Sequence, residues 1–423
     1  MAQMFEELET SEYIRCNLNN YTLTDIKFEQ LKEMIYLLIF ILLLFLLVFA
    51  IDAFPQFNTW QSRIKIGRFP NRNAWQEKIL TVSNKWLTNT PTIPLTDNNR
   101  LIIIDMLRGN YTRSAIQSWQ EAALVLGLTE YLKKTGNADT AEKIQRFVDQ
   151  KMTSEGSWKH KPTESDHAIL AYAFLNADGI AHEKYRPAFD ETWHMILSLT
   201  GEDGTVSYKS HVRQYRFVDT VGFIAPFLVT YGLKFNVPAA VDLAVKQITE
   251  YSAYGMMHQK HLPFHTYEVE SKIPVGLSGW GRGLGWYVIG LIDTWHALPD
   301  IHPAKNELEI LVVKTARPAI RFQEANGGFH WLMFDKGSRL DSSTAATLAW
   351  FFTLAAEIPE ISEECLAARE KALDYLQSVT RRSGAVDFSQ GDTKGIGVYS
   401  QNFDILPFTQ GFVLRTLNMS QQT

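Results

Sequence analysis

The sequence is poor in the residues that mark several large classes of protein. Only two of its 423 residues are cysteine, Cys16 and Cys365, which excludes a framework of disulfide bonds. Its 41 basic and 46 acidic residues give a net charge of −5 and show no basic cluster, so we expect no nucleic-acid partner. The sequence also lacks a glycine-rich phosphate loop and a nucleophilic serine elbow. These absences argue against a disulfide-stapled domain and against nucleotide-dependent or serine-dependent chemistry.

The sequence offers little for a metal ion or an organic cofactor. His258, His261 and His265 fall in one loop, without the helical setting or the neighbouring thiolates that zinc sites use. Residues 280–286 read WGRGLGW, but no predicted strand precedes these glycines, so they do not indicate a dinucleotide site. We expect neither a metal nor a cofactor. We favour hydrogen bonding to a substrate as the task of one of the histidines.

One uncharged apolar run stands near the N-terminus. Residues 34–51 read MIYLLIFILLLFLLVFAI, which is long enough to span a bilayer. The long polar segment before this run and the lack of a small-residue cleavage site after it argue against a removed signal peptide. We predict a tail over residues 1–33, a transmembrane anchor over 34–52 and a linker over 53–73, with a buried core helix as the alternative. The nearest basic residues precede the run, which favours a cytoplasmic N-terminus and a periplasmic domain on the inner membrane.

Beyond residue 73 the chain is helical by periodicity. Apolar residues spaced three and four apart predict twelve helices, with weak strand signals confined to the loops. Their ranges are 76–90, 114–135, 139–152, 165–176, 187–199, 219–234, 238–251, 282–297, 304–323, 342–357, 361–380 and 407–418. Twelve helices make six hairpins, which can close into a toroid of six inner and six outer helices, the (α/α)6 barrel. We therefore predict an all-α fold with this barrel over residues 74–423, and an open helical solenoid is the alternative.

Two regularities along the chain indicate repeated hairpins. Turns that begin with a glycine and soon reach an aromatic residue or histidine recur along the chain, as in stacked supersecondary units. The glycines of these turns are Gly156, Gly204, Gly255, Gly328 and Gly384. Alternate helices from residue 165 onward are rich in Ala, Gly and Phe, as expected of inner helices, and the helices between them carry more charge. Inner helices of a toroid run the same way, so the residues that open them meet at one mouth.

Two acids open otherwise apolar inner helices. Asp219 lies in RFVDTVGFIAPFL and Asp166 in ESDHAILAY. An acid at such a position is often a helix cap, and capping remains the alternative for both residues. Two carboxylates in one pocket, however, can hold different pKa values, so that one of them donates a proton near neutral pH. We therefore interpret Asp219 and Asp166 as the candidate catalytic residues.

A third group of residues suits the binding of a sugar acid. Trp280, Arg282 and Trp286 surround three glycines. An arginine can bind a carboxylate through two parallel hydrogen bonds, and a tryptophan offers a flat apolar face to a sugar ring. Tight helix packing through the glycines is the alternative. We expect Arg282 to share a pocket with the two acids.

These motifs resemble those of glycoside hydrolase families 88 and 105, the unsaturated glucuronyl and unsaturated rhamnogalacturonyl hydrolases. The resemblance runs from about Trp75 to the C-terminus and is most specific over residues 278–286, which read SGWGRGLGW. Residues 218–228 resemble the segment that bears the family's catalytic Asp, and the segment around Asp166 resembles that of its second Asp. Residues 118–122, SWQEA, resemble the start of the first inner helix, whose early residues contact the sugar.

The resemblance implies an (α/α)6 barrel that needs no metal or organic cofactor. It implies that an Asp protonates the C4=C5 double bond of a terminal unsaturated uronic acid, after which water adds at C5 and the hemiketal opens to release the next sugar. It assigns the proton donor to Asp219 and its partner to Asp166. The substrate-binding residues that it implies are Trp119, Tyr208, His265, Trp280, Arg282 and Trp286. His258 is the alternative to His265, and Tyr208 stands where the rhamnogalacturonyl branch is expected to have a histidine.

The predicted function is that of a membrane-anchored hydrolase acting on an oligo- or polysaccharide that contains a uronic acid. One alternative is an inactive barrel that binds polysaccharide, with envelope polysaccharide assembly proteins as its partners. A lyase or an inverting glycosidase on the same barrel is another alternative, and Tyr208 and His265 are compatible with a lyase base. The presence of both Asp166 and Asp219 favours the hydrolase.

Overall fold

The fold is described in a computed structural model of the chain. The structure describes residues 2–91, 93, 97–98, 100–108 and 117–419, and of residues 2–24 only the backbone. Contacts between residues divide the chain into two units, 1–60 with 98–108 and 61–97 with 109–423.

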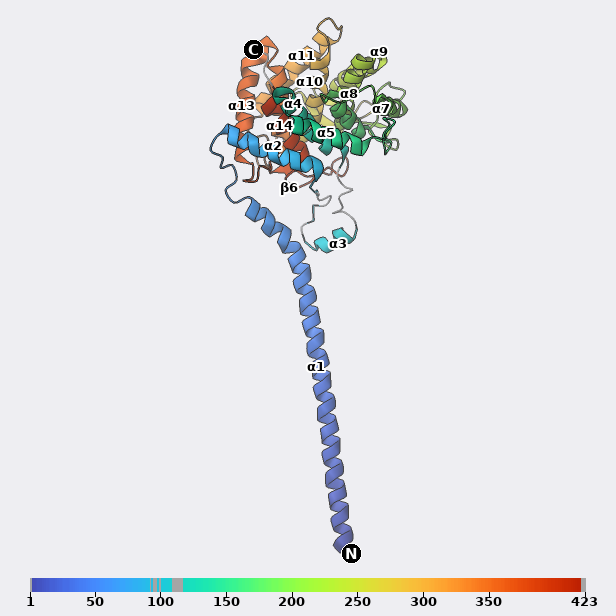
Figure 1. The fold of residues 1–423 in the computed structure, drawn as a ribbon, viewed down its shortest axis with the longest axis vertical. Helices are drawn as coiled ribbons and strands as arrows, with labels where there is room; N and C mark the ends of the chain where they lie inside the picture. Colours follow the sequence, from blue (N-terminus) through green and yellow to red (C-terminus); the bar gives the residue numbers. More distant parts are fainter. Residues whose placement is uncertain (1, 92, 94–96, 99, 109–116, 420–423) are drawn as a thin grey trace. The chain divides into compact units, whose positions relative to one another are not determined.

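The N-terminal helix is longer than the sequence predicts. α1 (Ala2–Ser62) is one continuous helix (Figure 1), and most of its large apolar side chains from Ile26 onward are exposed. The linker predicted over 53–73 is wrong for residues 53–62, which belong to this helix. Pro55 removes only one backbone donor, and the hydrogen bonds on either side of it continue the helix.

A short helix that the sequence analysis missed belongs to the same unit. α3 (Ile102–Leu107) is only six residues long, too short for a periodic pattern to stand out. The carboxylate of Asp52 accepts hydrogen bonds from the backbone N–H groups of Leu101 (2.7 Å) and Ile102 (2.8 Å). Asp52 thereby satisfies donors at the start of α3 that the helix itself leaves open.

Among the described residues, two helices are long and apolar enough to cross a membrane, judged by length and composition alone. They cover residues 25–62 and 218–235. In the second helix, 78% of the most apolar stretch is buried inside the protein, as expected of a core helix, whereas the corresponding stretch of the first is 0% buried. The N-terminal helix is therefore the candidate for a membrane anchor or a signal sequence.

The second unit contains the helices predicted from periodicity. All twelve are confirmed among the residues that the structure describes, with ends that differ from the predicted ends by a few residues. They are α2 (Arg72–Thr88), α4 (Ser118–Thr135), α5 (Ala138–Lys151), α6 (Ala168–Asn176), α7 (Arg186–Leu199), α8 (Val218–Phe235), α9 (Pro238–Tyr254), α10 (Gly281–Ala297), α11 (Lys305–Arg321), α12 (Ser342–Ala355), α13 (Ser362–Ser378) and α14 (Pro407–Asn418). A 3-10 turn, η2 (Ser165–His167), leads into α6.

Alternate helices of this unit form a closed inner ring. α4 packs on α6, α6 on α8, α8 on α10, α10 on α12 and α12 on α14, and α14 returns to pack on α4. α5, α7, α9, α11 and α13 each pack on the inner helix that precedes them, and α2 packs on α14 and α4. Every residue of α12 is buried, whereas α13 buries a single stripe, as expected of inner and outer helices. The contact between α14 and α4 excludes the open solenoid.

Short strands connect the ends of the helices. β3 (Leu262–Glu268) pairs antiparallel with β1 (Tyr215–Phe217), β2 (Met256–Met257) and β4 (Pro274–Ser278). β1 leads directly into α8, and its Phe217 lies opposite Thr266 of β3. This pairing brings His265, the neighbour of Thr266, close to the first turn of α8. β5 (Ser389–Gln390) pairs with β6 (Phe403–Asp404) before α14 begins.

A buried ion pair joins the inner helices away from their N-terminal ends. Asp293 of α10 and Arg415 of α14 are 1% and 3% exposed, and Oδ2 of the acid lies 2.8 Å from Nη1 of the arginine. Asp293 also accepts hydrogen bonds from Trp350 Nε1 of α12 (2.7 Å) and from the Tyr172 hydroxyl of α6 (3.1 Å). The Arg415 guanidinium lies 3.7 Å from the centre of the Trp350 ring. Four inner helices therefore share one charge-neutral polar centre.

Removal of one charge from this pair should destabilise the fold strongly. We expect Asp293→Asn to lower the free energy of unfolding by about 3–5 kcal/mol, because Arg415 would be left as an uncompensated buried charge. The measurement is the urea midpoint of the full chain in detergent, followed by circular dichroism. Asp300→Asn is the control, because Asp300 is 97% exposed and lies 3.7 Å from Lys305, and exposed ion pairs contribute little. Equal midpoints for the two variants would contradict the role of Asp293.

Candidate active site

A cavity of about 310 Å³ is lined by side chains from the N-terminal ends of α4, α8 and α10. Its walls also include residues of β3 and of the loop that follows β5. Seven of the eight residues singled out in the sequence line it, namely Trp119, Tyr208, Asp219, His265, Trp280, Arg282 and Trp286. The eighth, Asp166, is not among the lining residues. The N-terminal ends of three inner helices therefore line one cavity, with Asp219 and Arg282 but without Asp166, which was expected there.

Asp219 lies in the first turn of α8 but does not cap that helix. Within the described part of the chain, its side chain makes no capping hydrogen bond. Its Oδ2 lies 3.5 Å from Nε2 of His265, and the side chain is 14% exposed. Nδ1 of His265 in turn lies 3.1 Å from the hydroxyl of Tyr399. The interpretation of Asp219 as a helix cap loses its support, and His265 lies between this carboxylate and the hydroxyl of Tyr399.

Asp166 lies in η2, and it too makes no capping hydrogen bond among the described residues. Its Oδ1 lies 3.2 Å from Nδ1 of His167. The carboxylate of Asp166 raises the pKa of His167, mainly by hydrogen bonding, against the opposing effect of burial. The backbone N–H of Ser165 donates to the carbonyl of Tyr208 at 3.2 Å, which attaches η2 to the segment that carries the cavity-lining tyrosine.

Tyr208 links the two acids electrostatically. Burial raises the pKa of the Tyr208 hydroxyl far above its usual value, and the charges of Asp166 and Asp219 raise it further. A hydroxyl in this position keeps its proton at neutral pH and can donate a hydrogen bond. The tyrosine that stands in place of the expected histidine is therefore neutral at neutral pH.

Aromatic rings build much of the cavity wall. Trp119 and Trp286 meet edge to face, with ring centres 5.7 Å apart. Phe223 packs on Trp286 at 4.5 Å, and Trp280 lies 5.0 Å from the ring of His265. Such walls suit the apolar faces of a sugar ring, while the polar groups between them are left to fix its orientation.

Arg282 is committed to the protein backbone. It is 1% exposed, and its Nη1 and Nη2 atoms each donate, at 2.5 Å, to the carbonyl oxygens of Gln390 and Gly391. The guanidinium lies 5.6 Å from the Trp280 ring and 6.0 Å from the Trp119 ring. The sequence analysis expected Arg282 to bind a carboxylate of the substrate. In the structure two of its five N–H donors bind the carbonyls of Gln390 and Gly391, and Arg282 also lines the cavity.

Sequence reasoning missed Asp392, a second carboxylate on the cavity wall. Its Oδ2 accepts a hydrogen bond from Nε2 of Gln117 at 2.8 Å, and Oε1 of Gln117 accepts from Nε1 of Trp119 at 2.5 Å. Burial raises the pKa of Asp392, although the charge of Arg282 and the hydrogen bond from Gln117 oppose this rise. Asp392 lies in a loop without periodicity, so only the short polar run after Gln390 pointed to it.

The three histidines of the predicted cluster separate into two sites. His265 lines the cavity of Asp219, whereas His258 and His261 line another cavity of about 520 Å³ next to α9 and α11. Burial, with the charges of Lys314 and His258, lowers the pKa of His261 to about 4. In the part of the chain that the structure describes, no group of three or more His, Cys, Asp or Glu side chains is arranged to hold a metal ion.

Comparison with known proteins gives one family and one fold. The model of Glycosyl Hydrolase Family 88 matches residues 96–414. A possible member of glycoside hydrolase family 105 from Klebsiella pneumoniae is 18% identical, covers 83% of this chain and 93% of its own, and has a TM-score of 0.69. The unsaturated glucuronyl hydrolase of Bacillus sp. GL1, responsible for the degradation of glycosaminoglycan, is 14% identical and has a TM-score of 0.60. The match covers 81% of this chain and 96% of the hydrolase. A polysaccharide lyase, BACCELL_00875, has the same identity, the same two coverages and the same TM-score. At these identities the similarity shows the fold alone.

The contact between Asp166 and His167 predicts an altered titration of the histidine. We expect His167 to titrate above its usual pKa of 6.5 in the folded protein, and Asp166→Asn to bring the value down. Because the folded-state pKa is raised, the contribution to stability is fully present below about pH 6.5 and is lost as the pH rises through the raised value. NMR of histidine-labelled protein measures the pKa of His167 in the wild type and in the Asp166→Asn variant.

His182 is the internal control for this titration. Its pKa is lowered, first by burial and then by Lys234, and it should not change in the Asp166→Asn variant. The account of Asp166 would be wrong if His167 titrated at 6.5 or below in the wild type, or if its pKa were the same in the variant.

Proposed function

The chain belongs to glycosyl hydrolase family 88 and is a glycoside hydrolase, and from this premise we propose that it removes a terminal unsaturated uronic acid from an oligo- or polysaccharide. The observation that carries the proposal is the setting of Asp219. This acid opens an inner helix without capping it, and it lines an aromatic-walled cavity beside His265 and Tyr399. Unsaturated glucuronyl hydrolases share the fold, which is consistent with the proposal.

The double ring of helices is assigned to the (α/α)6 barrel. The assignment rests on the closed inner ring, on the outer helices that each follow an inner one, and on the similarity to solved structures over most of both chains. In such a barrel the N-terminal ends of the inner helices face one mouth. Asp219, Arg282 and Trp119 all lie in the first turns of such helices.

Asp219 is the proton donor in the proposed reaction. Its proton goes to C4 of the C4=C5 double bond, and positive charge develops at C5 and is shared with the ring oxygen. Water then attacks C5 and gives its proton to Asp166, and exchange of protons with solvent discharges Asp166 and reprotonates Asp219, so both acids return to their starting states. The hemiketal opens to a ketone at C5, and the hemiacetal thus formed at C1 collapses and releases the next sugar. One water is consumed, and the residues are unchanged.

The other polar groups support this reaction by orientation. His265, held by Tyr399, keeps the carboxylate of Asp219 in one place. Asp166 is the partner that handles water, acting next to the neutral hydroxyl of Tyr208. Trp119, Trp280 and Trp286 bind the faces of the sugar, and Asp392 accepts hydrogen bonds from sugar hydroxyls. Arg282 contributes its positive charge to the wall while it holds the loop after β5.

The apolar part of α1 serves as a single-pass anchor over residues 34–52. Support comes from the length and hydropathy of this helix and from the exposure of its apolar side chains. Exposed apolar surface costs roughly 25 cal/mol per Å² in water, so a helix of this kind is stable in lipid. The barrel then lies on the periplasmic side of the inner membrane, where polysaccharide fragments reach its mouth.

The proposal is tested with the Asp219→Asn variant on unsaturated uronyl disaccharides. The double bond absorbs in the ultraviolet, so its consumption is followed as a loss of absorbance. We expect the wild type to consume the substrate and the variant to be slower by on the order of 10²–10⁴, the typical contribution of a positioned acid. Asp139→Asn is the matched control, because Asp139 lies in the first turn of the outer helix α5. It should leave the rate unchanged.

Each other outcome of this assay rejects a specific part of the proposal. Equal rates for the wild type and a folded Asp219→Asn variant would show that Asp219 is not the acid. A wild type that consumes no unsaturated substrate would exclude the hydrolase function. Formation of new absorbance from an intact uronate polysaccharide would identify a lyase, and binding without any change would identify a polysaccharide-binding protein.

A further inference from the structure

The segment that follows α1 is tied to the helical domain by one arginine. Arg63 donates from Nε to Oδ2 of Asp387 at 2.8 Å and from Nη2 to Oδ1 at 2.9 Å, so that it binds both oxygens. Nη2 also donates to the carbonyl of Phe403 at 3.0 Å. The guanidinium lies 4.5 Å from the centre of the Phe388 ring. Such a two-point hydrogen bond fixes direction as well as distance.

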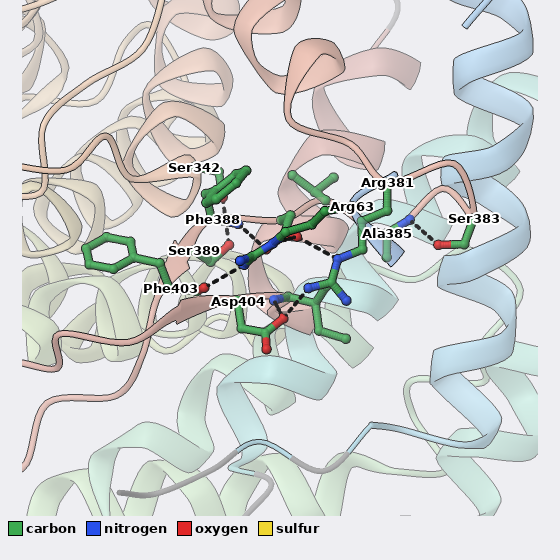
Figure 2. A network of polar contacts seen from close by, with 12 residues as sticks. Arg63, Ser342, Arg381, Ser383, Ala385, Phe388, Ser389, Phe403 and Asp404 are labelled. Atoms are coloured by element: carbon green, nitrogen blue, oxygen red, sulfur yellow. Dashed lines mark hydrogen bonds and ion pairs between the residues drawn. The ribbon is translucent and has the colours of Figure 1, made fainter. Parts of the chain in front are cut away.

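Asp387 depends on this arginine because it is deeply buried. Its side chain is 0% exposed, whereas that of Arg63 is 30% exposed. A second arginine, Arg381, donates from Nε to Asp387 at 2.6 Å and from Nη2 to Asp404 at 2.5 Å (Figure 2). Burial alone would raise the pKa of Asp387, but the hydrogen bonds and charges of Arg63 and Arg381 lower it. Asp387 is therefore an anion, and loss of Arg63 would remove two of its charged hydrogen bonds.

Residues 387–392, which we call the strap, run from this acid to the cavity wall. The strap begins with Phe388 in the left-handed region, at a φ of +60°, a backbone conformation that non-glycine residues rarely adopt. Asp387 holds it there, since its Oδ1 accepts from the N–H of Phe388 at 2.7 Å. The carbonyl of Phe388 accepts from the N–H of Ser342, the first residue of α12, at 3.1 Å. The clamped acid thus sets the direction in which the strap leaves.

The far end of the strap reaches the candidate active site. The N–H of Gln390 donates to Asp341 at 2.9 Å, and its side-chain carbonyl accepts from Nε1 of Trp280 at 2.9 Å. The carbonyls of Gln390 and Gly391 accept from Arg282, and the strap ends at Asp392, which lines the cavity. Five peptide bonds therefore separate Asp387, which Arg63 binds, from Asp392 on the cavity wall. The hydrogen bonds of the residues between them hold the strap in place.

We propose that Arg63 is a positioning residue for the active site, because it fixes Asp387 and thereby holds the strap with Asp392 against the cavity. The chain that directly follows α1 is then a working part of the hydrolase domain rather than a passive linker. The kinetic part of this inference rests on the proposed function. Its structural part, the coupling between Arg63 and the strap, does not.

The kinetic test is a double-mutant cycle in the full-length protein. The probe is an unsaturated uronyl disaccharide, and the variants are Arg63→Ala, Asp392→Ala and both together. We expect each single variant to raise KM about tenfold with kcat changed by less than about twofold, since the strap contacts the sugar and not the double bond. In the double variant KM should stay within about twofold of that of Asp392→Ala, because coupled residues are not additive. Effects on KM that multiply, or an unchanged KM in Arg63→Ala, would overturn the proposal.

Arg72→Ala is the matched control. Arg72 also lies shortly after α1, pairs with Asp374 at 2.8 Å and stacks 5.2 Å from the Trp75 ring. It makes these contacts on α2 and α13, away from the strap, and its removal should leave KM unchanged. A rise in KM equal to that of Arg63→Ala would show that any arginine in this segment has the same effect, and the proposal would fail.

Hydrogen exchange tests the coupling even if no substrate is found. The amides of Phe388, Gln390 and Gly391 all donate hydrogen bonds within the domain. In Arg63→Ala we expect them to exchange at least about tenfold faster, while amides of α4 and α8 keep their rates. Unchanged exchange in the strap, or equal acceleration throughout the domain, would overturn the proposal, because the first shows no coupling and the second only a general loss of stability.

Discussion

The closed ring of inner helices depends on one buried ion pair, Asp293 with Arg415. Both side chains are almost fully buried, and their polar contacts reach α6, α10, α12 and α14. Two charges in the core are tolerated only as a neutral, well-oriented pair, so these helices must meet in one register. That register also decides what happens at their other ends. Of the three helices whose first turns line the cavity, α10 belongs to this centre, and α4 and α8 pack directly on helices that do.

The cavity is lined by two carboxylates, Asp219 and Asp392, while a third acid, Asp166 of η2, is not among its lining residues. Arg282 is engaged by backbone carbonyls, and Lys209 pairs with Glu164 at 2.8 Å. The acids differ in surroundings: Asp219 faces His265, Asp166 faces His167, and Asp392 faces Gln117. Each of the three acids therefore has its own polar neighbour.

The sequence predicted the helices well because their apolar faces are periodic and long. From the direction of inner helices it also predicted that Asp166, Asp219 and Arg282 would share one mouth, and Asp219 and Arg282 do line one cavity, whereas Asp166 does not. It did not predict Asp392, Gln117 or Tyr399, whose positions depend on hydrogen bonds between loops far apart in the chain. The sequence analysis was also wrong about the region after the apolar run, because Pro55 does not end α1. It did not predict the hydrogen bonds between Arg63 and Asp387, which lie 324 residues apart. Local patterns carry no record of such contacts.

The central claim is that the cavity holds an unsaturated uronic acid with its double bond at Asp219. A crystal structure of the Asp219→Asn variant with a bound unsaturated disaccharide tests it most directly. The account predicts C4 of the terminal sugar within about 3.5 Å of the side chain at position 219, the near-attack range for reacting atoms. The sugar ring should lie against the wall that Trp119 and Trp286 form, with the strap in its present position. A disaccharide bound in the cavity with its double bond turned away from position 219, or bound outside the cavity, would contradict the account.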